Sequence, residues 1–253
     1  MLAKGLSLLV ALGKHPDGAG VSELSREVGL PVSTVYRLLA IMTASGFVHF
    51  DAKRRRYYMG LKVFELSRQV SLVKRLSDVA LPVMHRISDI TRESVSMAVR
   101  EGKELVYVEW AEGRNRIQIS GYVGTRGSLH CTSQGKVLLA FMPEDERENL
   151  IRQIRLEPRA PNTITDPAEL RGDLKLARER GFALADEENE EGICAIGVPV
   201  IGVQGRPVAA ISVVAPVFRV SRERLEQFAP LLRDAAREIE LQLPQSNTPF
   251  INA

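Results

Sequence analysis

The sequence has few of the residues that build disulfide or metal sites. Its 253 residues include 2 cysteines, 4 histidines and 1 tryptophan. Cys131 and Cys194 are too few for a disulfide framework, and neither belongs to a C-x-x-C pair. The histidines are scattered and lack the spacing of zinc ligands. We therefore expect a protein that has no metal site, no cofactor and no disulfide.

Long apolar segments are absent as well. No run approaches the roughly 18 residues that a membrane span requires. The leucine-rich stretch Leu6–Leu12 is short, contains Ser7, and is followed by Lys14–Asp17 instead of a small-residue cleavage site. With 45% hydrophobic and 26% charged residues, the composition is that of a globular protein with one or two domains. We expect a cytoplasmic protein that has no membrane partner.

Charge is distributed unevenly along the chain. Residues 1–77 contain 12 lysines and arginines against 5 aspartates and glutamates, a net charge of +7. The remainder holds 22 basic and 26 acidic residues, a net charge of −4. A basic front and an acidic back indicate two different tasks, and nucleic acid is the natural partner of the basic segment.

The first 60 residues have the pattern of three helices followed by a hairpin. Ser22 is a candidate N-cap for the second helix, and Gly29 is typical of a left-handed residue that ends it. We expect helices at Leu2–Leu12, Glu23–Val28 and Pro31–Met42, and strands at Phe47–Phe50 and Tyr57–Met59.

The second and third helices have the pattern of a helix-turn-helix motif, in which the second helix presents its first residues to DNA bases. An apolar stripe at Val35, Leu38 and Leu39 leaves the polar residues between them exposed. Arg37 could bind a guanine through two hydrogen bonds. An ordinary helical hairpin would show the same pattern, so the motif alone leaves both readings open. The candidate DNA-binding residues here are Ser22, Ser33, Thr34, Tyr36 and Arg37.

The turn of the hairpin favours the DNA-binding reading. It carries four consecutive cations, Lys53, Arg54, Arg55 and Arg56. A solvated turn commonly holds one or two cations, whereas a basic wing contacts phosphates or a minor groove. A helix-turn-helix and a basic wing within a segment of net charge +7 predict binding to double-stranded DNA.

Beyond residue 60 the pattern becomes that of a linker followed by a mixed domain. A helix over Leu61–Lys74 has no partner in so small a front domain, which favours pairing with a second copy. A shorter helix follows at Asp78–Asp89. We expect strands at Ser94–Arg100, Glu104–Trp110, Ile117–Tyr122, Ala183–Asp186, Ala195–Ile201 and Pro207–Val214, and helices at Gly135–Phe141, Pro143–Ile154, Pro167–Arg180 and Arg222–Leu241. The strand Pro207–Val214 is apolar nearly throughout, so it should be central.

Several spaced motifs resemble the IclR family of bacterial transcriptional regulators, and the resemblance covers nearly the whole chain. Matches in the right order are far more specific than any one motif. The matching segments are Lys4–Leu9, Gly29–Leu39, Tyr57–Leu61, Leu129–Ala140, Glu191–Val200 and Ala209–Val213.

The resemblance implies an α+β protein that has three parts. These are a winged helix-turn-helix domain at 1–60, a linker helix at 61–77 and a GAF/PAS-like effector-binding domain at 78–245, followed by a tail at 246–253. It also implies a dimer or tetramer that binds palindromic promoter sites and responds to a small molecule.

The resemblance also carries a candidate effector site. Residue by residue, the family's pocket positions fall on Ser133, Gln134, Ile193, Ala195 with neighbouring Cys194, Ser212 and Val214. A helix beginning near Gly135 would place donors where they suit a carboxylate, so a small organic acid, aromatic acids included, is the expected effector. The family's pocket cysteine falls on Ala195 and an upstream acidic residue on Ala185, which makes this site less polar.

Two alternatives remain. Ser133 and Lys136 fit the S-x-x-K pattern of penicillin-binding enzymes, and a cysteine could serve as a nucleophile. The accompanying S-D-N and K-T-G elements are missing, and the neighbours His130 and Cys131 would point to opposite sides of a strand. A ligand-independent DNA-binding protein is the other alternative, but DNA binding alone needs far less chain. We expect a regulator and not an enzyme, and we place Trp110 in the core.

Overall fold

The computed structural model describes residues 1–67, 71–202 and 205–243. The chain divides into two compact units, Met1–Ser71 and Leu72–Ala253. The expected tail at 246–253 and residues 68–70 of the expected linker lie outside the described residues. In the part of the chain that the structure describes, no helix is long and apolar enough to cross a membrane.

The first unit is a winged helix-turn-helix. Its helices are α1 (Leu2–Gly13), α2 (Val21–Val28) and α3 (Val32–Ala44), followed by the hairpin strands β1 (Val48–Asp51) and β2 (Arg56–Met59) and by α4 (Leu61–Ser67). The two strands pair antiparallel. Buried apolar side chains from α1, α2, α3 and both strands form its core, among them Leu8, Leu12, Leu24, Val35, Leu39, Val48 and Tyr57.

The expected elements of this unit are confirmed, with one change at the start of α2. Gly20, and not Ser22, is the N-cap residue, and its backbone N–H donates to Glu23 Oε2 at 3.3 Å. Ser22 lies one residue inside the helix with its side chain exposed. Gly29 ends the helix with φ 64°, the left-handed conformation expected of it.

The helix pattern around the predicted linker differs from the expectation. Helix α4 ends at Ser67, and α5 (Ser71–Thr91) continues without a break across residues 75–77, where the sequence pattern placed a gap between two helices. A continuous apolar stripe explains this, because Leu76, Ala80, Met84 and Ile87 are all buried on one face of α5.

The second unit is built on a six-stranded antiparallel sheet. Its strands are β3 (Ser94–Glu101), β4 (Glu104–Ala111), β5 (Arg126–Ser128), β6 (Ala183–Asp186), β7 (Ile193–Ile201) and β8 (Pro207–Pro216). They are arranged in the order β5-β4-β3-β8-β7-β6, so the apolar β8 is central, as expected. The curled sheet with helices on both faces is that of a GAF/PAS-like domain.

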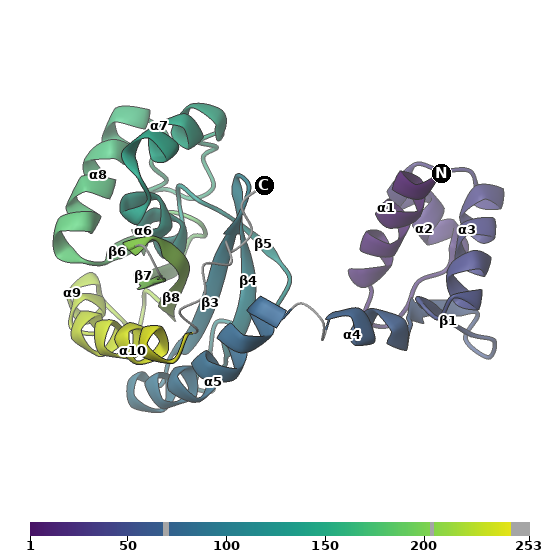
Figure 1. The fold of residues 1–253 in the computed structure, drawn as a ribbon, viewed down its shortest axis with the longest axis horizontal. Helices are drawn as coiled ribbons and strands as arrows, with labels where there is room; N and C mark the ends of the chain where they lie inside the picture. Colours follow the sequence, from purple (N-terminus) through teal and green to yellow (C-terminus); the bar gives the residue numbers. More distant parts are fainter. Residues whose placement is uncertain (68–70, 203–204, 244–253) are drawn as a thin grey trace. The chain divides into compact units, whose positions relative to one another are not determined.

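Helices cover both faces of this sheet (Figure 1). One face packs against α5 and α10 (Ala229–Gln242), with α9 (Arg222–Glu226) at its edge. The other face carries α6 (Ser133–Phe141), α7 (Glu144–Gln153) and α8 (Pro167–Arg180). Side chains alternate along each strand, so every residue of the sheet belongs to either the α5/α10 face or the α6/α8 face.

Two expected elements of this unit are wrong. Residues 117–122 form no strand, and β5 lies further along at Arg126–Ser128. Gly121 instead lies against the Trp110 ring, where a Cβ would approach the ring to 2.4 Å, so the chain crosses the sheet face there. The expected helix at 222–241 is interrupted between α9 and α10, because Pro230 in the first turn of α10 cannot continue a preceding helix.

Candidate nucleic-acid interface and effector site

Helix α3 presents a polar surface at its N-terminal end. Val35, Leu38 and Leu39 are buried in the core of the unit, which fixes the rotation of the helix. The residues between them therefore face solvent: Ser33, Tyr36 and Arg37 are exposed and Thr34 is half-buried. The four side chains thus lie where a recognition helix would present them to base edges.

The hairpin turn is ordered by the carboxylate of Asp51. Asp51 Oδ1 accepts hydrogen bonds from the backbone N–H of Lys53 at 2.8 Å and of Arg54 at 3.1 Å. The bond from Arg54 holds the pKa of the Asp51 carboxyl below its usual value. Arg55 adopts a left-handed conformation with φ 54°. Lys53, Arg54 and Arg55 are all exposed, so the turn carries three cations at the protein surface.

Arg56 differs from the three cations before it. Its guanidinium donates to the backbone carbonyls of Asp17 and Gly18 in the turn between α1 and α2 and pairs with Glu23 at 3.8 Å. The same turn pairs with β2 through two 2.9 Å backbone hydrogen bonds between Ala19 and Tyr57. Arg56 therefore ties the hairpin to the helices, and the exposed basic charge of the turn comes from the other three, of which Arg54 also donates to Tyr58 Oη at 3.5 Å.

Two rows of residues cross the α6/α8 face of the large sheet and bring the candidate effector residues together. The strand registers define a polar row, which consists of Trp110, Ser96, Ser212 and Gly197. The next row, here called the outer row, consists of Ser94, Val214, Ala195 and Ala185. Ile193 lies two residues before Ala195 and so shares this face.

The N-terminal end of α6 packs directly on the polar row. Thr132 caps the helix by accepting from the Gly135 N–H at 3.1 Å. The next residues contact the sheet at Gly197, where an added Cβ would lie 2.9 Å from the Ser133 carbonyl carbon and 3.1 Å from Gln134 N. Only glycine at residue 197 permits this approach of helix to strand.

Hydrogen bonds join this helix end to the row. Ser133 Oγ and Ser212 Oγ are 2.9 Å apart, and Gln134 Nε2 donates to Ser96 Oγ at 3.0 Å. All four side chains are buried. By contrast, Ile193, Ala195 and Val214 are only partly buried, although β7 and β8 lie inside the sheet. The site thus combines a buried polar layer with an accessible apolar surface.

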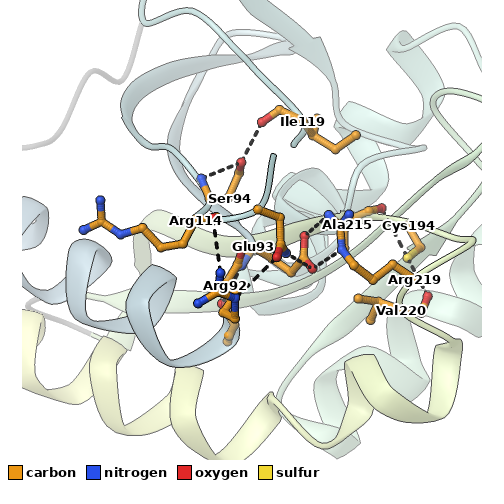
Figure 2. A network of polar contacts seen from close by, with 12 residues as sticks. Arg92, Glu93, Ser94, Arg114, Ile119, Cys194, Ala215, Arg219 and Val220 are labelled. Atoms are coloured by element: carbon orange, nitrogen blue, oxygen red, sulfur yellow. Dashed lines mark hydrogen bonds and ion pairs between the residues drawn. The ribbon is translucent and has the colours of Figure 1, made fainter. Parts of the chain in front are cut away.

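Cys194 is not part of this grouping. It alternates with Ile193 and Ala195 and therefore points to the α5/α10 face, where it belongs to the core. Its Sγ donates to the carbonyls of Ala215 at 3.4 Å and Val220 at 3.3 Å (Figure 2). Burial raises the pKa of the Cys194 thiol to about 12, so it is a neutral thiol at pH 7.

The side chains of the S-x-x-K pattern are engaged elsewhere. Lys136 Nζ lies 2.6 Å from Glu188 Oε1 and 2.9 Å from Asp173 Oδ2, and the lysine side chain is 1% exposed. Ser133 Oγ contacts Ser212 and not this ammonium. A buried lysine that is paired with two carboxylates is not arranged to act as the base for a serine nucleophile. Ser133 and Lys136 therefore make separate structural contacts.

A loop from β4 crosses the outer row and is tied to it by polar contacts (Figure 2). Ser94 Oγ donates to the Ile119 carbonyl at 2.6 Å and accepts from the Gly113 N–H at 3.1 Å. Beside it, the Arg219 guanidinium donates one hydrogen bond to each carboxylate oxygen of Glu93, both at 2.7 Å. Glu93 is only 3% exposed and Arg219 is half-buried, and this bidentate pair fixes the end of β3 against the turn after β8.

Four participants were missed from the sequence: Ser94, Ser96, Gly197 and Trp110. Ser96 and Trp110 join the polar row only through the β3–β4 and β3–β8 registers. The place of Ser96 between the apolar residues Val95 and Met97 of a strand is the one signal that would have marked it as a site residue. Trp110 is half-buried on the sheet face and not enclosed in the core.

Comparison with known proteins supplies independent matches. The IclR helix-turn-helix domain matches residues 1–52, and the bacterial transcriptional regulator IclR C-terminal domain matches residues 69–241. The HTH-type transcriptional repressor AllR of Escherichia coli is 33% identical over 242 residues, which cover 96% of this chain and 89% of the relative.

Two solved structures share the fold along nearly the whole chain. The Thermotoga maritima IclR structure is 33% identical with a TM-score of 0.79, covering 96% of this chain and 98% of that one. An IclR homolog from Microbacterium hydrocarbonoxydans, crystallised with 4-hydroxybenzoate, is 29% identical with a TM-score of 0.82, covering 96% of this chain and 100% of that one.

Proposed function

The chain belongs to the IclR family of ligand-responsive bacterial transcriptional regulators, and we propose which of its residues bind DNA and which class of effector it senses. In this proposal α3 reads promoter DNA in the major groove and the basic turn contacts phosphates beside it. A small carboxylate on the α6/α8 face of the sheet changes the affinity for DNA. The protein works in the cytoplasm, where its promoter targets are.

The DNA-binding part rests on one observation, that a single unit carries both the exposed polar end of α3 and an ordered turn with three exposed cations. Arg37 reads a base edge, Ser33 and Thr34 bind phosphate or base, and Tyr36 flanks them. Lys53–Arg55 supply phosphate contacts and with them the salt dependence of binding. Ser22, exposed in the first turn of α2, is placed to contact the backbone that the first helix of the motif crosses.

A dimer fits this arrangement best. Two α3 helices about one duplex turn apart, roughly 34 Å, would match a palindromic site. A second copy also accounts for the exposed apolar residues of α1 and α4, among them Leu2, Leu6, Val10 and Leu61. A tetramer would pair two such dimers.

The effector part rests on the two rows and on the 4-hydroxybenzoate found in the Microbacterium relative. The N-terminal end of α6 favours an anion through its dipole. Ser133, Gln134 and Ser212 supply polar contacts, while Ile193, Ala195 and Val214 supply an apolar wall. An organic acid with a hydrophobic or aromatic body suits this lining better than a small, fully polar acid. Cys194 faces the core on the α5/α10 side of the sheet, so it does not contact the effector in this proposal.

Regulation requires that the acid bind one DNA-binding arrangement better than the other. A difference of about 1–3 kcal/mol is typical of such coupling. Helix α5 begins at the boundary of the two units and packs along the sheet, so it is the element through which the sheet could influence the helix-turn-helix.

Fluorescence anisotropy with the DNA upstream of the protein's own gene tests the proposal. We expect tight, salt-sensitive binding that prefers this DNA to a scrambled sequence, and that changes when 4-hydroxybenzoate or benzoate is added. Replacing Lys53–Arg55 by alanines should weaken binding, whereas Lys103→Ala, an exposed cation of the other unit, should not. Equal affinity for specific and scrambled DNA, with and without the acids, would reject the proposal.

A further inference from the structure

The polar row contains one buried donor that has no acceptor. Among the residues that the structure describes (1–67, 71–202 and 205–243), Trp110 Nε1 has no hydrogen-bond partner although it is shielded from solvent. Its neighbours in the row are satisfied: Ser96 Oγ receives Gln134, and Ser212 Oγ contacts Ser133. An unpaired buried N–H costs free energy, so few are retained without a reason.

The loop that covers the Trp110 ring lies away from its N–H. Trp110 lies opposite Ser96 in the β3–β4 register, so its side chain is on the α6/α8 face. The loop passes over the six-membered ring, since a Cβ at Gly121 would meet Cε3, Cζ3 and Cη2 at 2.4–2.7 Å. Nε1 is on the opposite edge of an indole from Cε3 and Cζ3, so the N–H edge is turned away from Gly121.

We infer that the Trp110 N–H is a binding group for the effector and donates a hydrogen bond to one of its oxygens. This inference rests on the proposed function, because it places one more contact in the same site. The acceptor would be a carboxylate, phenol or ketone oxygen, and binding would satisfy a donor that is otherwise unpaired. Ligands that lack an oxygen at this point would leave the N–H buried and unpaired, so Trp110 would discriminate against them.

The surroundings of the indole favour a flat ligand. Tyr107 and Trp110 form an edge-to-face pair with ring centroids 6.1 Å apart. On the same sheet face, the partly buried Val214 and Ala195 lie in the next row, two and three strands away from β4. An aromatic ring packs well against such a surface. The effector class that meets both requirements is an aromatic acid, with an oxygen placed to accept from Trp110.

The test replaces the N–H and preserves the ring. Because the sequence contains 1 tryptophan, biosynthetic replacement of tryptophan by 3-benzothienylalanine changes residue 110 alone and puts sulfur in place of N–H. Calorimetric titration with 4-hydroxybenzoate, benzoate and pyruvate then gives the dissociation constants of the replaced and unchanged proteins. Ser212→Ala serves as a control in the same row, and thermal unfolding without ligand reports on folding.

We expect the replaced protein to bind the preferred acid about tenfold more weakly, to unfold at the same temperature or higher without ligand, and to bind DNA unchanged. Retained affinity for the acid in the replaced protein, with Ser212→Ala weakened, would overturn the role of Trp110 and leave the proposed function standing. A lower unfolding temperature without ligand would also overturn it, because the N–H would then have a structural partner. If the unchanged protein binds none of the three acids, the proposed carboxylate site fails, and the inference with it.

Discussion

Replacing Gly197 by alanine tests the contact between α6 and the sheet. The added Cβ would lie 2.9 Å from the Ser133 carbonyl carbon, 3.0 Å from its oxygen and 3.1 Å from Gln134 N. All three are backbone atoms, so no rotation of a side chain relieves the collision. Gly197 is not among the glycines with positive φ, so alanine adds no backbone strain of its own. The substitution therefore isolates one steric contact.

The helix has little room to retreat. On the other side of its first turn, Gly135 lies against the Leu129 backbone so closely that a Cβ there would come within 2.3 Å. Overpacking of this kind costs about 1–3 kcal/mol. For a unit of this size each kcal/mol lowers the melting temperature by about 2–4 °C, so we expect a fall of roughly 2–12 °C for the second unit.

Thermal unfolding followed by circular dichroism or calorimetry measures this change. Gly172→Ala is the matched control, because Gly172 lies inside α8 and a Cβ there would meet nothing within 4 Å. Alanine in that helix should raise stability by up to about 1 kcal/mol. DNA affinity without ligand should be unchanged in both variants, and acid binding should weaken only in Gly197→Ala. If Gly197→Ala is as stable as the unchanged protein, then α6 does not lie against β7 as described.

Three further changes test the remaining parts of the molecule. Arg37→Ala should cost about 1–3 kcal/mol of DNA-binding free energy and relax the preference at one base step in anisotropy measurements; a loss that is uniform across sequences would assign Arg37 to phosphate. Alanines at Lys53–Arg55 should reduce the slope of log affinity against log salt by about 3, whereas Arg56→Ala should act mainly by lowering the melting temperature of the first unit. Burial lowers the pKa of His130, so the folded state disfavours its protonated form, and stability should fall as the pH drops below 6.5. His130→Asn should show less of this loss between pH 7.5 and 5.5 in urea unfolding, and an identical loss would assign the effect to other groups.

The elements that the sequence predicted best have their signals close together in the chain. Helix α8 and strand β6 begin and end at the expected residues, because Asp166 caps the helix, Gly181 ends it and an apolar strand follows directly. Helix α3 was expected at Pro31–Met42 and spans Val32–Ala44, and its polar residues and apolar stripe are separated by the helical period alone.

The failures arise where tertiary contacts override a local pattern. Residues 117–122 alternate like a strand, yet the chain there crosses Trp110 and is bound through Ile119 to Ser94. The helix break near Pro230 does have a local signal, because a proline in the first turn of a helix cannot continue a preceding helix. By contrast, the local sequence pattern does not mark the start of α5 near residue 71. Its apolar stripe is recognised only from the sheet residues that it packs against.

The candidate effector site shows how much depends on register. Family resemblance placed Cys194 and Ala195 together, but adjacent residues of a strand point to opposite faces, and the β7–β8 register assigns only Ala195 to the face of Ser212. The β3–β8 register brings in Ser96, and the β3–β4 pairing then adds Trp110. Ser96 and Ser212 lie 116 positions apart in the chain, a distance over which no periodicity carries information. An effector that contacts Ala195 must therefore lie on the side of the sheet that holds the unpaired Trp110 N–H, whereas a thiol-directed reagent would have to open the core to reach Cys194.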